Sequence, residues 1–248
     1  MPVANGYLGG LGLSNSGTDA TNDIIIATGA CVDQTNTTLM RLTTSLAKQL
    51  DAAWAVGTNA GWLDTGAIGN TTYHAYIIQR TDTGVVDCIA STSASAPVLP
   101  TNYILSRRIG SILRESAAII GFTQEDNYFR RNTGVSSWSV TNPGTAAVTR
   151  TLSTPVGINV IAEVHGQVSG QAAGQNYSYV SDLATTDEAA SNDRCQWGGN
   201  QAALGAFAGW AQVRTNTSAQ VRTRIFASDA GTSYNAATIG WTDRRGQG

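Results

Sequence analysis

Charged side chains are scarce in this sequence, and lysine is nearly missing. Only 13% of the 248 residues are charged, about half of the roughly 25% that is usual in soluble domains. The basic residues are fourteen arginines and one lysine, Lys48. Because the formal net charge is −2, no basic field attracts polyanions, and we expect neither nucleic-acid nor membrane binding.

Cysteines and long apolar runs are also few. Cys31, Cys88 and Cys195 are odd in number and far apart, which argues against a disulfide framework or a zinc ribbon. It favours buried thiols in a protein made in a reducing cytoplasm. The longest aliphatic block is Ile24–Ile26, too short to span a membrane. Residues 1–6 lack the basic and apolar regions of a secretory signal.

The abundant residues are those of strands and turns. Threonine outnumbers even the 27 glycines, and asparagine and serine are frequent. Threonine favours strands, whereas glycine, asparagine and serine favour turns. The composition therefore predicts a mostly β protein with short connections.

Three parts are expected along the chain. Residues 1–20 are rich in glycine, asparagine and serine with scattered leucines, which favours an N-terminal arm that attaches to a neighbouring protein over a disordered tail. Residues 21–130 are predicted to form a mixed β module with one helix. Residues 131–248 are predicted to form an antiparallel β-sandwich, jelly-roll-like, because short strands recur there without helical patterns.

The one helical pattern lies in residues 37–53. Leu39, Leu42, Leu46 and Leu50 recur at a spacing of three to four residues, which predicts an amphipathic helix packed on a sheet. The preceding residues, 33–36, are expected to form a turn and the helix cap.

Catalytic and metal-binding motifs are not evident. His74 and His165 lack metal-ligand spacing, and we interpret each as a core or interface histidine. Four acidic residues share one loop, namely Asp182, Asp187, Glu188 and Asp193. Turn or cap roles are favoured for them, with a calcium loop or a glycosidase pair as alternatives. We expect no catalytic residue, no metal and no cofactor, and therefore no enzyme.

Five aromatic residues lie beside amide, hydroxyl or carboxylate residues in predicted loops. Aromatic faces next to such groups are typical of sugar sites, because the ring stacks on C–H groups and the polar side chains bind hydroxyls. The alternative is that these residues anchor loops or fill a subunit interface. The candidate glycan-binding residues are Trp62, Tyr177, Tyr179, Trp197 and Tyr234.

Arginines alternate with β-branched residues near the end of the chain. Arg222 and Arg224 alternate with Val221, Thr223 and Ile225, so a strand would place both arginines on one face. We expect this face to meet carboxylates elsewhere in the chain or in another subunit, and both arginines are candidate subunit-interface residues.

Two stretches of the sequence resemble a known group of proteins. The first covers most of residues 20–125 and includes Asp23–Ile26, Leu50–Gly66, Thr72–His74, Asp82–Asp87 and Arg107–Ser111; the second is Ile239–Gly246. The first is similar to the β-rich module near the C-terminus of tail-fibre and related virion proteins of tailed bacteriophages, and the second is similar to the chain terminus common in that group.

The resemblance implies a virion structural protein, typically a homotrimer, made in the cytoplasm of the host bacterium. With no long shaft before residue 20, a short fibre, spike or decoration knob on tail or capsid is expected, attached to other virion proteins through residues 1–20. Binding of a host surface glycan is a further expectation. A glycan-degrading virion enzyme and a free carbohydrate-binding module remain as alternatives.

Overall fold

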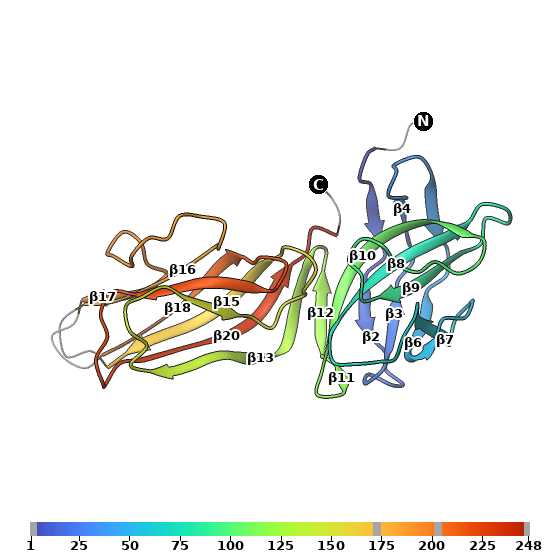
Figure 1. Cartoon of the computed structure of the whole chain (residues 1–248). Coiled ribbons are helices and arrows are strands. Elements are labelled where there is room, and N and C mark those ends of the chain that lie inside the picture. The colour runs from blue at the N-terminus through green and yellow to red at the C-terminus, as the bar shows by residue number, and fades with distance from the viewer. Residues whose placement is uncertain (1–3, 171–174, 201–204, 246–248) are drawn as a thin grey trace. The chain divides into compact units, whose positions relative to one another are not determined.

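The computed structural model describes residues 4–170, 175–200 and 205–245, which form twenty strands (Figure 1). Over these residues the chain contains no helix. The chain divides into two compact units. The first unit comprises the described parts of residues 1–132 and 243–248, and the second unit comprises those of residues 133–242.

Two sheets make up most of the first unit, and its remaining strand, β12, pairs with residues 128–131. An eight-stranded sheet has the order β11-β10-β8-β9-β7-β6-β3-β2, and a three-stranded sheet has the order β1-β4-β5. The pairs β6–β7 and β7–β9 are parallel and the other pairs antiparallel, so the module is mixed as expected. The strands are β1 (Leu8–Gly10), β2 (Leu13–Asn15), β3 (Asp23–Ile26), β4 (Gly29–Val32), β5 (Leu39–Leu42), β6 (Leu46–Ala53), β7 (Ala60–Leu63), β8 (Thr72–Arg80), β9 (Val86–Ser91), β10 (Tyr103–Glu115), β11 (Ala118–Ile119) and β12 (Phe122–Glu125).

The N-terminal residues are part of this unit and not a separate arm. Strand β1 pairs with β4, and β2 pairs with β3. Leu11 and Leu13 are buried in the unit. The scattered leucines that suggested an attachment arm are therefore core residues of the first unit, and the expectation for residues 4–20 is corrected; residues 1–3 lie outside the described residues.

The predicted helix over residues 37–53 is wrong, because this segment forms β5 and β6 in two different sheets. Burial alternates with a period of two, with Met40 and Leu42 inside in β5 and Lys48 and Leu50 inside in β6. An amphipathic helix would have placed Lys48 away from its buried leucine stripe. In the structure its side chain is fully buried and forms an ion pair with Asp87 at 2.8 Å.

The second unit is an antiparallel β-sandwich, as predicted. One sheet has the order β13-β20-β15-β18 and the other β14-β19-β16-β17; β12 also pairs with residues 128–131 of β13, within the first unit. The strands are β13 (Tyr128–Thr141), β14 (Val148–Thr151), β15 (Ile161–Ser169), β16 (Gln175–Ser181), β17 (Trp197–Asn200), β18 (Ala206–Arg214), β19 (Gln220–Ile225) and β20 (Ser233–Thr242).

The strand order of the second unit is that of a jelly roll. The first strand pairs with the last, the second with the seventh, the third with the sixth and the fourth with the fifth. This nested pairing is what two interlocked Greek keys produce. One apolar cluster fills the space between the sheets, with Trp138, Val164 and Tyr234 from one sheet and Val180 and Val221 from the other. The jelly-roll-like prediction is therefore confirmed.

The chain returns to the first unit after the jelly roll. The expected sandwich, residues 131–248, extended to the end of the chain, whereas the observed second unit ends at Thr242. The backbone N–H of Asp243 donates to the carbonyl of Asn127 at 2.8 Å. Residues 243–245 thus belong with β12 and β13 of the first unit and not with the sandwich.

Asp33 organises the loop between β4 and β5, although it caps no helix. Its carboxylate accepts backbone N–H groups of Thr35, Thr37 and Thr38 at 2.9, 2.8 and 2.6 Å, and the hydroxyl of Thr35 also donates to it. Burial by itself would raise the pKa of Asp33. The hydrogen bonds outweigh that effect and hold the pKa at about 2.

The depressed pKa of Asp33 predicts a contribution to acid stability. A carboxyl whose folded pKa lies below its unfolded value of 3.8 stabilises the fold above about pH 4 and loses that effect as pH falls toward 2. We expect Asp33→Asn to lower the free energy of unfolding by about 2 kcal/mol at pH 7 and to flatten its pH dependence between pH 4 and 2. Urea titrations across this range measure both effects. Asp51→Asn, at an exposed position of β6, is the control, and equal pH profiles for wild type and Asp33→Asn would contradict the assignment.

Candidate functional site

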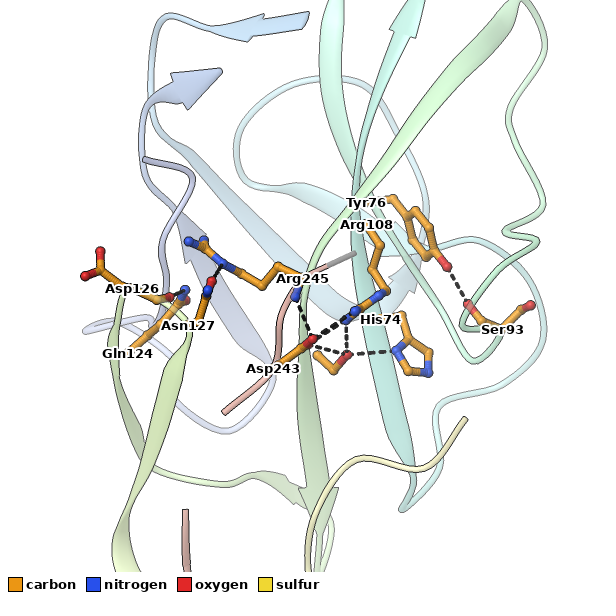
Figure 2. A network of polar contacts seen from close by, with 10 residues as sticks. His74, Tyr76, Ser93, Arg108, Gln124, Asp126, Asn127, Asp243 and Arg245 are labelled. Atoms are coloured by element: carbon orange, nitrogen blue, oxygen red, sulfur yellow. Dashed lines mark hydrogen bonds and ion pairs between the residues drawn. The ribbon is translucent and has the colours of Figure 1, made fainter. Parts of the chain in front are cut away.

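A cluster of buried polar side chains lies in the first unit, where β8, β10 and the end of the chain meet (Figure 2). The guanidinium of Arg108 donates to both carboxylate oxygens of Asp243, at 2.5 and 2.8 Å. Ser111 lies beside this pair, with its Oγ 3.0 Å from Arg108 Nη1 and 3.3 Å from Asp243 Oδ2. His74 Nδ1 is 2.8 Å from the same Oγ.

The cluster continues along the last described residues. The backbone N–H of Arg245 donates to Asp243 Oδ1 at 2.8 Å, and its Nε donates to Asn127 Oδ1 at 2.8 Å. Asp243 and Arg245 are both buried. Asp243 and Arg245 are thereby held inside the first unit by β10 and by the turn after β12.

This cluster has the residue types of a hydrolase triad without the required access. A nucleophilic serine must reach a substrate carbonyl, whereas Ser111 and His74 are fully buried. Arg108 already neutralises the carboxylate through two hydrogen bonds. The arrangement is suited to fixing the fold, and the interpretation of His74 as a core histidine is confirmed.

A second buried ion pair holds the eight-stranded sheet together. Lys48 Nζ contacts Asp87 at 2.8 Å and donates to the carbonyls of Ala55 and Gly57 at 2.7 and 3.0 Å. The other oxygen of Asp87 accepts the backbone N–H of Gly57 at 2.6 Å. Both charges are therefore paired and hydrogen-bonded, as burial of an ion pair requires.

Four of the five candidate glycan-binding aromatics are buried in the cores. Trp62 donates to Cys88 Sγ at 3.2 Å inside the first unit, and Trp197 packs on Tyr234 with ring centroids 6.2 Å apart in the jelly-roll core. Tyr177 packs edge-on against Phe226 and donates to Asn192. A buried ring offers no face to a sugar, so Trp62, Tyr177, Trp197 and Tyr234 are packing residues; Tyr179 is half-buried.

Arg222 and Arg224 share a face of β19, and they meet a carboxylate of their own chain. Their guanidinium groups lie 3.7 and 3.5 Å from Asp187. Arg222 also donates to the carbonyls of Leu183 and Thr185, at 3.3 and 3.0 Å. The predicted alternation and the expected carboxylate partner are thus confirmed, while a role at a subunit interface stays a prediction.

The other loop acids also contact arginines. Asp182 accepts from Arg214 at 3.1 Å, and Glu188 lies 3.1 Å from Arg194. A hydrogen bond from Ser191, together with nearby Arg194, lowers the pKa of Asp193, whereas a glycosidase acid needs a raised pKa. Within the described residues, no group of three or more histidine, cysteine or acidic side chains could hold a metal ion.

The outer face of the β13-β20-β15-β18 sheet carries an exposed tryptophan that the sequence analysis missed. Trp210 on β18 is 62% exposed and lies directly opposite His165 on β15, itself half-exposed. His165 is therefore a surface residue and not a core histidine. The alternation of Gln212 and Arg214 with Val213 already gave the signal, because the same parity places Trp210 on the polar face.

A shallow groove on this face extends to His165, the residue opposite Trp210. It has a volume of about 370 Å³ and is open to solvent. Its polar lining residues are Ser136 and Ser139 from β13, His165 and Gln167 from β15, and Asn235 from β20; Trp138, Gly166, Ala236 and Ala237 complete the lining. Gln167 lies opposite both Asn235 and Ala208 in the ladder. The groove thus brings amide, hydroxyl and imidazole groups together on one face.

Comparisons with known proteins give few matches. No family model matches the chain, and no curated protein matches it. Among solved structures, the chain is similar to the infectious bursal disease virus Gt strain structure, with 12% identity, a TM-score of 0.21 and coverage of 99% of this chain and 74% of the other. It is also similar to the infectious bursal disease virus VP2 subviral particle, with 13% identity, a TM-score of 0.24 and coverage of 100% and 75%. Scores this low carry no argument about this chain. Separately, none of the described residues form a helix long and apolar enough to cross a membrane.

The Arg108–Asp243 pair predicts a large loss of stability when one partner is removed. Asp243→Asn leaves the buried guanidinium without its counter-charge, and such changes typically cost about 3–5 kcal/mol. The exposed Arg80–Asp82 pair is a matched control, because it also has two arginine–carboxylate hydrogen bonds. Asp82→Asn should leave the free energy of unfolding almost unchanged, because water screens an exposed ion pair. Urea denaturation measures both changes, and equal losses would contradict a stabilising role for the buried cluster.

Proposed function

We propose that this chain is a structural protein of a bacteriophage virion, namely a short fibre, spike or decoration knob on the tail or capsid. The observation that carries the proposal is the convergence of separate sequence stretches. The segments that resemble phage virion proteins, Thr72–His74, Arg107–Ser111 and Ile239–Gly246, contribute His74, Arg108, Ser111 and Asp243 to one buried cluster.

The meeting of these segments in one cluster argues against a resemblance that arises only from similar composition. Arg108 and Asp243 are 135 residues apart, yet their side chains form two hydrogen bonds. Neither stretch has a structural reason to carry its charged residue without the other, because an unpaired buried charge is strongly destabilising. The segments that carry the resemblance therefore meet in one buried cluster that stabilises the fold, as expected of a structural protein.

The jelly roll is consistent with this proposal. Double-sheet jelly rolls of eight strands recur in viral capsid and lectin domains. The fold also serves other functions, so it supports the proposal without carrying it. The acids of the loop after β16 are engaged with arginines, and no observation favours the alternative of a glycan-degrading enzyme.

A homotrimer is part of the proposal. Charge is depleted at the cores of subunit interfaces, where arginine is retained more than lysine. The first unit also exposes several large aliphatic side chains, among them Val56, Val98 and Ile104 at 60%, 57% and 66%. Such side chains on a surface with few charges favour association over a monomeric state.

Immunogold electron microscopy of intact virions tests the virion assignment. Purified particles from the phage that encodes this chain should be labelled by antibody raised against the purified protein, at the tail or on the capsid. Antibody absorbed with the purified protein is the control. Particles that carry no label, and in which mass spectrometry of the disrupted virions detects no peptide of this chain, would refute the proposal.

Light scattering of the purified full chain tests the trimer. We expect a mass of about three times the 25.9 kDa of one chain at micromolar concentration. Replacing an exposed aliphatic residue of the first unit by a charge, as in Ile104→Asp, should weaken association, because a charge at an interface core must be desolvated. Val156→Asp, at an exposed position of the second unit, is the control. A monomeric wild-type chain would contradict the trimer.

A further inference from the structure

We propose that the outer face of the β13-β20-β15-β18 sheet binds an uncharged sugar ring of a glycan, with Trp210 as the stacking platform. This inference extends the proposed function. It rests on that function only in taking the glycan to come from a host surface. It places the site away from the aromatics that the sequence suggested, because four of those are buried.

Trp210 is suited to stack on a sugar because its side chain is accessible and its neighbours on this face leave it exposed. Its side chain is 62% exposed. Along β18, Ala208 and Gln212 precede and follow it on the same face, and His165 lies opposite on β15. The apolar face of an indole ring packs against apolar groups, while its N–H can stay in contact with water. The C–H face of a pyranose is such an apolar group.

Polar groups for the hydroxyls lie in the adjoining groove. Gln167 and Asn235 are opposite each other in the β15–β20 ladder, and directly opposed residues have Cβ atoms about 5 Å apart. Both side-chain amides donate and accept hydrogen bonds, as vicinal hydroxyls require. Ser136 and Ser139 add hydroxyl groups from β13.

The charge and dimensions of the groove favour a neutral sugar. The polar residues that line it are amides, hydroxyls and one imidazole, and its lining includes no carboxylate. The carboxylate of Glu163 contacts His165 at 3.2 Å. The groove has a volume of about 370 Å³ and is open to solvent, as expected of a surface that a sugar ring approaches from one side.

A second copy of the chain is a weaker fit to this face. Interface hot spots are aromatic residues ringed by closely packed contacts. The neighbours of Trp210 on this face are instead the exposed residues Ala208 and Gln212 and the half-exposed His165. The large exposed aliphatic side chains that suit protein contact, Val56, Val98 and Ile104, belong to the first unit.

Glycan binding by the full-length protein tests the inference. A glycan array of neutral oligosaccharides containing glucose, galactose, mannose or N-acetylhexosamines should give at least one ligand, whose dissociation constant is then measured by titration calorimetry. Trp210→Ala should weaken binding about tenfold or more, and Gln167→Ala should weaken it severalfold. Phe226→Ala removes another exposed aromatic ring of the second unit and should leave affinity unchanged. Thermal melting checks that each variant is folded.

Three results would overturn the inference. The wild-type protein binds no neutral glycan on the array; or folded Trp210→Ala and Gln167→Ala bind as tightly as wild type; or Trp210→Ala dissociates the oligomer in light scattering, which would make this face a subunit interface. Each result is separate from the virion assignment, because immunogold labelling of particles does not depend on glycan binding.

Discussion

The buried ion pair between Arg108 and Asp243 ties the end of the described chain to the first unit. It requires the chain to leave this unit after Asn132 and to return at Asp243, so the second unit is an insertion between two fixed points. A jelly roll meets this requirement, because its first and last strands, β13 and β20, are neighbours in one sheet. The two ends of the inserted unit therefore lie side by side, as its two attachments to the first unit demand.

The few charged side chains of this sequence are largely paired within the chain. The only lysine is fully buried with Asp87, and Arg108 is buried with Asp243. Arg222 and Arg224 share Asp187, and Arg214 contacts Asp182. These charges are thus paired within the chain, and fewer unpaired charges remain than the composition suggests. Exposed apolar side chains on a surface of that kind favour the association that we propose.

Local alternation in the sequence predicted more of the second unit than of the first. In β19, Arg222 and Arg224 alternate with Val221, Thr223 and Ile225, so the strand, its arginine face and the sandwich around it were all predictable. In β6, the single buried lysine broke that pattern, and Leu39, Leu42, Leu46 and Leu50 imitated a helix. The partner that makes Lys48 a core residue, Asp87, lies 39 positions away, and no local pattern carries that information. The prediction of glycan-binding aromatics was wrong for a related reason. A tryptophan near polar residues in the sequence, such as Trp62, still faces the core when its position in the strand points inward. Trp210 shows the converse, since parity with Gln212 and Arg214 was sufficient to place it outside.

The two units expose different kinds of side chain. In the first unit, exposed aliphatic side chains such as Ile104 accompany sheets fixed internally by buried ion pairs, a combination suited to rigid assembly. In the second unit, the exposed sheet face offers one accessible indole, amides and hydroxyls, which suits a small polar ligand. The proposed association through the first unit does not require Trp210 to be buried, so the proposed assembly and the proposed glycan site make no conflicting demands on the same residues. The two proposals are therefore compatible within one chain that carries few charges.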